Sequence, residues 1–316
     1  MGIADQMTSA AAALLETLDD QQRRLARYAF DEDKARRWLE YRPNQRPGAC
    51  IGELSLPARK AAHRLLSTAL SEHAFAQAMG IVALEEILDR KEGGERGRHS
   101  GDYWISVFGD VAADRWGWRF EGHHISVSMT LSGDQVSPTP VFFGANPACV
   151  SYAGRPVSRP LAPEEDLAQA LLDAMDPAAR ADAFVAPDAP VDIHSATSPR
   201  AARIEPRGVA ASRLGPGAHA ALGQLIALYL DRLRPELARR ERARLAGGEL
   251  YFAWEGPPAS AARHYYRIQG DDLLIEYDTT DEGNHAHTVL RRPDSDFGGD
   301  VLAAHLRHEH DPAGGQ

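Results

Sequence analysis

The chain has 316 residues, of which 43% are hydrophobic and 25% charged, a composition typical of a folded protein with one large domain or two ordinary ones. Its net charge of −10 argues against a nucleic-acid partner, and its two cysteines, Cys50 and Cys149, exclude a disulfide framework or a thiolate zinc site. No apolar run reaches the roughly eighteen residues of a membrane span, and the N-terminus lacks the order of a signal peptide, so we expect a cytoplasmic protein without a membrane partner.

The first hundred residues have helical spacing of their apolar positions. Thr8 or Ser9 is placed to cap a first helix, and a short second helix is predicted over residues 31–41, before Pro43. Pro57 then opens a long helical region that ends at Gly93.

From Tyr103 the apolar period changes to two, which indicates β-strands. Extended segments are predicted over residues 103–108, 116–131 and 136–143, with a turn at Gly133-Asp134 between the last two. The first half of the chain is therefore predicted to be helical and then an antiparallel meander.

The same order recurs in the second half. The sequence of residues 168–176, AQALLDAMD, is similar to that of residues 11–19, AAALLETLD. Three more pairs follow in the same order, with offsets that fall from 157 to 148: Ala218-His219 with Ala62-His63, residues 250–254 with the strand at Tyr103, and residues 267–275 with 119–127.

The sequence therefore predicts an α+β fold made by tandem duplication of a helical segment and an antiparallel β-meander. The first repeat would span residues 1–155 and the second 156–316, packed about a pseudo-twofold axis as one unit. Ligands are expected between the two halves. The proline-rich stretch over 185–217 is either a long loop over such a site or a surface excursion.

The stretch from Glu276 to His287, EYDTTDEGNHAH, joins two predicted strands and holds the densest group of metal-ligand side chains. His285 and His287 are two residues apart, so on a strand both imidazoles face one side, and Glu276 and Asp278 share a face of the preceding strand. This pattern suits a divalent metal such as zinc, iron or copper.

A further pair, His123 and His124, lies where the second repeat has Asp271 and Asp272. Because adjacent residues of a strand face opposite ways, we expect only one of the two to join His285 and His287. Three histidines would leave an open position for water or substrate. Candidates for fourth ligand, supporting carboxylate or general base are Glu121, Glu276 and Asp278.

Other polar residues give weaker indications. Arg119 and Arg267 occupy matching places in the two repeats, where each would support the sheet or bind a carboxylate. His305, His308 and His310 follow on a predicted C-terminal helix and are weaker candidates. Sequence motifs for nucleotide cofactors are absent, so no nucleotide cofactor is expected.

Four motifs together resemble the bacterial domain-of-unknown-function 3500 family. They are WGWRFEGHH at residues 116–124, PVFFGANP at 140–147, HYYRIQG at 264–270, and NHAH at 284–287 through DFG at 296–298. The resemblance covers nearly the full chain, which implies a complete family member, and it supplies no activity.

Two functions from different classes follow from these residues. The first is a metal-dependent enzyme with a histidine-rich site between the repeats, acting on a small molecule by hydrolysis at zinc or by oxidation at iron or copper. In it His285, His287 and one of His123 or His124 are ligands, and Glu121 is a general base or further ligand. The alternative is a non-catalytic protein that binds a small acidic metabolite through Arg119, Arg267 and aromatic residues.

Overall fold

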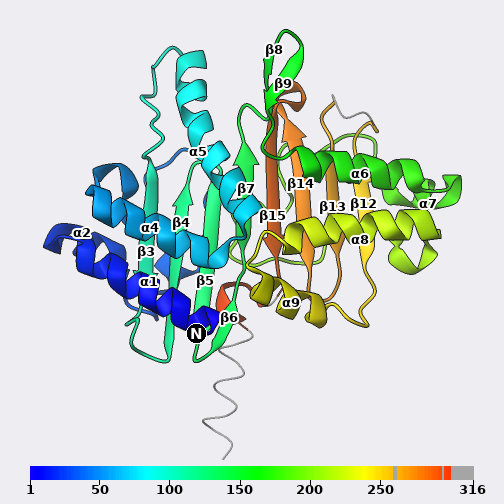
Figure 1. Cartoon of the computed structure of the whole chain (residues 1–316). Helices are drawn as coiled ribbons and strands as arrows, with labels where there is room; N and C mark the ends of the chain where they lie inside the picture. Colours follow the sequence, from blue (N-terminus) through cyan, green and yellow to red (C-terminus); the bar gives the residue numbers. More distant parts are fainter. Residues whose placement is uncertain (259–261, 294, 300–316) are drawn as a thin grey trace, which may run out of the picture.

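The structure, a computed structural model, describes residues 1–258, 262–293 and 295–299. Within these ranges the chain forms a mixed α+β fold, in which helices lie against a single 13-stranded sheet (Figure 1). The predicted fold class, α+β, is confirmed. His305, His308 and His310 lie outside the described residues.

The helices begin and end at several places that the sequence did not predict. The first begins at Ile3, before Thr8, because the Asp5 carboxylate accepts a 3.0 Å hydrogen bond from the Gly2 N–H at its start. The long region after Pro57 divides at Leu70, and Ser71 caps the second part. The helix predicted over 31–41 is only one turn long. The helices are α1 (Ile3–Thr17), α2 (Asp20–Ala26), α3 (Asp33–Arg36), α4 (Leu56–Ala69), α5 (Glu72–Lys91), α6 (Ala162–Ala174), α7 (Pro177–Ala183), α8 (Pro216–Leu230) and α9 (Pro235–Arg244).

The strands form one large sheet and a separate hairpin. The order in the large sheet is β1-β3-β4-β5-β7-β15-β14-β13-β12-β10, with β2 on β3, β6 on β5 and β11 on β12. All these pairs are antiparallel except β1–β3 and β10–β12. The strands are β1 (Arg27–Tyr28), β2 (Ala49–Cys50), β3 (Tyr103–Phe108), β4 (Arg115–Gly122), β5 (Ile125–Ser132), β6 (Gln135–Ser137), β7 (Val141–Ala145), β10 (Phe184–Ala186), β11 (Val209–Ala210), β12 (Tyr251–Glu255), β13 (Tyr265–Gln269), β14 (Leu274–Thr280) and β15 (His285–Arg291), with β8 (Val150–Tyr152) and β9 (Arg155–Ser158) in the hairpin.

The single extended segment predicted over residues 116–131 was wrong. It is a hairpin of β4 and β5, and the tight turn between them contains His123 and His124. His124 has a φ of 63°, in the left-handed region, which reverses the chain at this point. The two adjacent histidines are therefore not on opposite faces of a strand.

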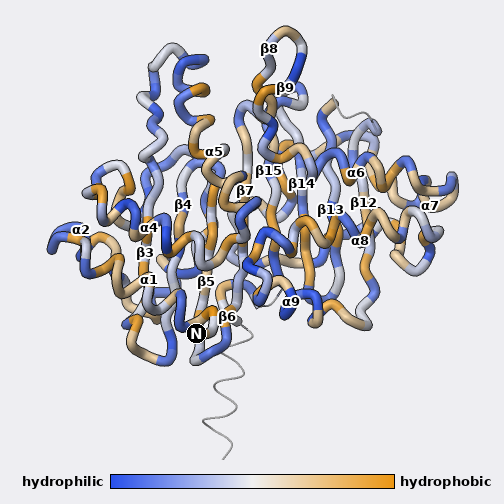
Figure 2. Tube along the Cα trace, in the orientation of Figure 1, coloured by the Kyte–Doolittle hydropathy of each residue, from blue (hydrophilic) through white to orange (hydrophobic). Residues whose placement is uncertain are grey.

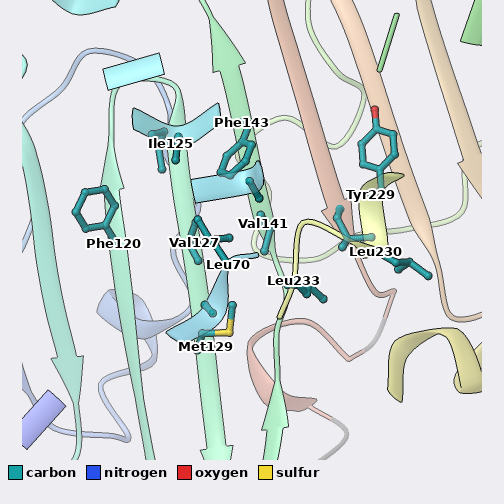
Figure 3. Close-up of a cluster of buried hydrophobic side chains, with 14 of the residues drawn as sticks. Leu70, Phe120, Ile125, Val127, Met129, Val141, Phe143, Tyr229, Leu230 and Leu233 are labelled. Carbon is teal, nitrogen blue, oxygen red and sulfur yellow. The ribbon is translucent and has the colours of Figure 1, made fainter. Parts of the chain in front are cut away.

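Helices cover one face of the sheet, and the main hydrophobic core lies between these helices and the sheet. In Figure 1 the helices α1, α4, α5, α6, α8 and α9 lie in front of the strands. Figure 2 shows hydrophobic residues recurring among hydrophilic ones along these helices, as expected of helices with one buried side. Figure 3 shows the strand residues Val127 and Val141 near Leu70 and Leu233, and all four are fully or almost fully buried.

The opposite face of the sheet is covered by loops. Leu39 and Tyr41 from the loop after α3, Ile193 from the loop after β10, and Phe297 pack in a second, smaller apolar cluster. They contact sheet residues that point away from the helices, namely Phe142, Tyr265 and Val289. The proline-rich stretch over 185–217 therefore includes a loop that packs on the sheet.

A buried ion pair joins the helical layers of the two halves. The Arg232 guanidinium donates to the Glu164 carboxylate at 2.8 Å, and neither side chain is exposed. Gln77 of α5 donates to the same carboxylate at 2.9 Å. A β-bridge between Leu70 and Leu233 lies beside it, so α4–α5 and α8–α9 are tied together on the helix side of the sheet.

Removing Glu164 should destabilise the fold strongly, because Arg232 would be left as an uncompensated buried charge. We expect Glu164→Ala to lower the free energy of unfolding by about 3–5 kcal/mol in urea titrations. The matched control is Asp271→Ala, which breaks the exposed ion pair with Arg203 and should change stability by less than about 1 kcal/mol. Equal effects of the two substitutions would contradict this role of the buried pair.

Candidate metal centre

The strands of the sheet separate apolar from polar side chains. On β4, Trp118 and Phe120 belong to the helix-side core, so the alternate residues Arg119 and Glu121 point to the opposite, loop-covered face. The same alternation on the other strands places all the strand residues of the predicted site on that loop-covered face: Arg119, Glu121, Arg267, Glu276, Asp278, His285 and His287.

Three histidines converge on this face at one end of β7 and β15. His124 comes from the β4–β5 turn, and His285 and His287 from β15, with candidate ligand atoms that all lie within 4.8 Å of one another. The Nε2 atoms of His124 and His285 are 2.8 Å apart. The ring centroids of His285 and His287 are 4.6 Å apart, and those of His124 and His287 are 5.4 Å apart. Of the adjacent pair His123 and His124, the structure thus places His124 in the triad.

Gly144 on β7 gives the imidazoles room to meet. Gly144 lies between the segments that carry the histidines. It pairs with His287 on the neighbouring strand β15, and its N–H donates to the His124 carbonyl at 2.8 Å. A Cβ atom at position 144 would lie 2.7 Å from Cδ2 of the His124 ring, closer than real contacts allow, and 3.0 Å from the Ala286 carbonyl oxygen, which is a tight contact. Only glycine at this position leaves the observed ring position free.

Two carboxylates lie behind His287. Its Nδ1 is 3.2 Å from Oδ1 of Asp278, its cross-strand partner, and 3.1 Å from Oδ1 of Asp192, on the loop after β10. Asp192 also accepts a 2.8 Å hydrogen bond from the Tyr41 hydroxyl, and Tyr41 stacks on Phe142 with ring centroids 4.0 Å apart. With both acids beside Nδ1, we expect Nε2 to be the nitrogen of His287 that serves the triad.

His285 has a polar neighbour of its own, the Asn146 side chain. The Asn146 amide nitrogen lies 3.5 Å from Nδ1 of His285, at the turn that follows β7. Each histidine of β15 thus has a polar side chain near Nδ1, an arrangement that fixes ring orientation in many metal sites.

The pKa values of His124 and His287 are shifted in opposite directions. Burial and the neighbouring histidines hold the pKa of His124 well below the ordinary value, so His124 is neutral. Burial alone would also lower the pKa of His287, but the charges of Asp278 and Asp192 and their hydrogen bonds raise it to about 9. The metal-free site therefore keeps a proton on His287, held between two carboxylates.

His123 belongs to a second, neighbouring group. Its ring lies against that of His124, with centroids 3.7 Å apart, and its Nδ1 makes a short hydrogen bond with the Glu85 carboxylate of α5. Glu85, His123 and His124 also have ligand atoms within 4.8 Å of one another. Arg98 lies 3.4 Å from His123 Nδ1 and 3.8 Å from Glu85, and its positive charge disfavours a cation in this second group.

The other residues that the sequence suggested for the site, Arg119, Glu121, Arg267 and Glu276, are bound to other partners. Arg119 donates to Glu121 at 2.7 Å, with both side chains buried. Arg267 donates to Glu255 at 2.6 Å, and Glu276 accepts from the Tyr265 hydroxyl at 3.0 Å. Glu121 and Glu276 belong to none of the groups with metal-ligand spacing in the part of the chain that the structure describes.

Sequence reasoning missed three residues of the site. Glu85 lies on a helix rich in charged residues, and Asp192 and Tyr41 lie in loops without a recognisable motif. Asp192 did have one signal, since it lies in the proline-rich stretch that was considered as a loop over the site. Loop contacts of this kind depend on the path of the chain, which periodicity does not encode.

The raised pKa of His287 makes a prediction for the metal-free protein. The ordinary histidine pKa is about 6.5, so the stability from this protonated group should be fully present below that pH and be lost as the pH rises through about 9. NMR titration of the histidine rings should show His287 protonated at neutral pH. In the Asp278→Asn control its pKa should fall, and a parent His287 that is already neutral at pH 7 would contradict the assignment.

Comparison with known proteins gives a family. No curated protein matches the chain, and no solved structure does. Among the described residues, no helix is both long enough and apolar enough to cross a membrane. A family model described as a protein of unknown function (DUF3500) matches residues 2–299, which include the whole histidine triad and the residues around it. The chain therefore belongs to the DUF3500 family, as its four motifs indicated.

Proposed function

We propose that this protein is a metal-dependent enzyme whose ion is held by His124, His285 and His287. The observation that carries the proposal is the convergence of these three imidazoles from two separate parts of the chain, with ligand atoms within 4.8 Å of one another. His124 and His287 are buried, and Asp278 and Asp192 lie behind His287. Carboxylates behind a ligating histidine are a recurrent feature of protein metal sites.

The spacing of the nitrogen atoms fits a transition metal. Two nitrogen ligands at about 2.0–2.1 Å from a tetrahedral zinc ion are roughly 3.3 Å apart. The Nε2 atoms of His124 and His285, at 2.8 Å, need to separate only slightly to accept an ion between them. Because His124 is neutral, it offers a lone pair without losing a proton.

Three protein ligands leave a position open for water or substrate. At zinc, the bound water would have a pKa near 7 and would act as a nucleophile, which gives hydrolysis. Iron or copper also accepts three imidazoles and would give an oxidative reaction on a small-molecule substrate. In either case Asp278 and Asp192 would orient His287, and Glu121, bound by Arg119, would support the sheet beside the site.

The pattern of elements supports a duplication as the origin of this site. Strand order is symmetric about the β7–β15 pair, and each half begins with two helices followed by a strand that is parallel to its neighbour, β1 in one and β10 in the other. We propose that residues 1–155 and 156–316 are tandem copies. The metal site would then have been kept at one end of the central strand pair, where it takes one ligand from the first copy and two from the second.

The alternative, a binding protein that holds an acidic metabolite through Arg119 and Arg267, is less favoured. Both guanidinium groups are completely buried, and each is paired with a glutamate, Glu121 or Glu255. A ligand carboxylate would have to displace these partners.

Elemental analysis of protein purified without a histidine tag tests the proposal. We expect near-stoichiometric zinc, iron or copper in the parent, and loss of at least about 90% of it in each of His124→Ala, His285→Ala and His287→Ala, because a site with three protein ligands rarely survives loss of one. The control is His219→Ala, which removes an exposed histidine and should retain the metal. Thermal melts check that each variant folds; folded variants that keep their metal would refute the site.

Gly144→Ala tests the geometry while leaving all three ligands in place. The added Cβ would displace the His124 ring, so metal affinity measured by chelator competition should fall by about 10–100-fold, as it does when other supporting groups are lost. Gly223→Ala, on α8, is the matched control, because nothing lies within 4 Å of its Cβ position. Unchanged metal affinity in folded Gly144→Ala would contradict the proposed role of His124.

A further inference from the structure

A large cavity lies beside the candidate metal centre. Its volume is about 890 Å³, and it is open to solvent on one side and lined by residues that include the loop over 43–48, the C-terminal part of α5 with the loop after it, and Trp104 of β3. This volume is in the range of small-molecule sites in proteins. Two of its lining residues, Glu85 and His123, are neighbours of the histidine triad.

His123 separates the cavity from the triad. One face of its ring lies against His124, at 3.7 Å between centroids. Its Nδ1 is hydrogen bonded to Glu85, and no described residue bonds to its Nε2. A molecule in the cavity would therefore meet a hydrogen-bond acceptor directly beside a proposed metal ligand.

Two of the three arginines that line the cavity are already engaged by the protein. Arg98 donates to both oxygens of Glu92, at 2.7 and 3.0 Å. Arg46 donates to the carbonyl oxygen of Asn44 at 2.7 Å, and its side chain is 1% exposed. Arg46 and Arg98 are thus poorly placed to bind an anionic ligand. The third, Arg96, has a side chain that is 62% exposed, and its guanidinium lies 3.9 Å from the Glu92 carboxylate.

The polar groups that remain are mainly acceptors. A 2.9 Å hydrogen bond from the Gly52 N–H to the Gly101 carbonyl holds Glu53 and Asp102 on neighbouring segments, and neither carboxylate forms an ion pair with a described residue. The Asn44 side chain adds an amide. An anion would be repelled by these carboxylates, whereas a molecule with many hydroxyl groups would donate to them.

The half-buried Trp104 adds a flat apolar surface to this lining. An aromatic face beside polar acceptors suits a ligand with both C–H and O–H groups. We propose that the cavity is the substrate chamber of the metal centre and that it takes a neutral, hydroxyl-rich small molecule of the saccharide class. The proposal rests on the proposed function for its chemistry, while binding in the cavity can be tested separately.

Saturation-transfer NMR on the full chain tests the chamber, with cellobiose and N-acetylglucosamine as neutral probes and citrate and putrescine as charged ones. We expect a neutral sugar to bind, and its affinity to fall at least about tenfold in Asn44→Trp, where the larger side chain fills the cavity from an exposed position. Tyr152→Ala, which removes an exposed aromatic residue on the β8–β9 hairpin, is the control and should bind as the parent does.

The outcomes separate the two proposals when metal content is measured on the same samples. Metal-loaded protein that binds neither sugar, or that binds citrate or putrescine in their place, would overturn the saccharide chamber and leave the metal site intact. Sugar binding that Asn44→Trp does not weaken would also overturn it. A chain that binds sugar but never metal would refute the proposed enzyme while supporting the cavity as a saccharide site.

Discussion

The antiparallel pairing of β7 with β15 is the contact on which the rest of this structure depends. It joins the strands of the first half to those of the second in one continuous sheet, from Ala286 opposite Ala145 to Leu290 opposite Val141. On the helix side, the Arg232–Glu164 pair closes the same junction. Strands that are distant in sequence form such pairs only when both faces bury enough surface to offset the entropy of a long loop. Here helices cover one face and loops the other.

The same pairing explains why a candidate metal centre lies where it does. The β4–β5 turn brings His124 to one side of β7, and β15 brings His285 and His287 to the other. The imidazoles meet over Gly144, the one position of the strand between them where no side chain intervenes. A neutral His124 and a protonated His287 then lie side by side, because burial lowers the pKa of both but two carboxylates lie within 3.2 Å of the His287 ring and raise its pKa. This difference follows from strand register and loop path together.

The loop-covered face is unusually polar for a buried surface. Arg119, Arg267 and Glu276 are fully buried there, and each has at least one partner of opposite charge or a hydrogen-bond donor. Charges of this kind contribute little net stability, since desolvation offsets most of their attraction, but removing one partner is costly. The buried polar groups therefore favour one position of each loop. Asp192 and Tyr41 are held over the sheet by the same polar contacts that orient His287.

Local spacing along the chain was enough to predict the α+β class, the change from helical to strand periodicity near Tyr103, and the shared face of His285 and His287, because these features depend on neighbouring residues alone. It also singled out Asp278 beside them. The choice between His123 and His124 depended on the fold, because a turn replaced the expected strand and placed the two rings against each other. The fold also brought in Asp192, which lies 95 residues before His287, and Glu85, which lies 38 residues before His123. Local periodicity fixes which way a side chain points, but long-range packing decides what it meets.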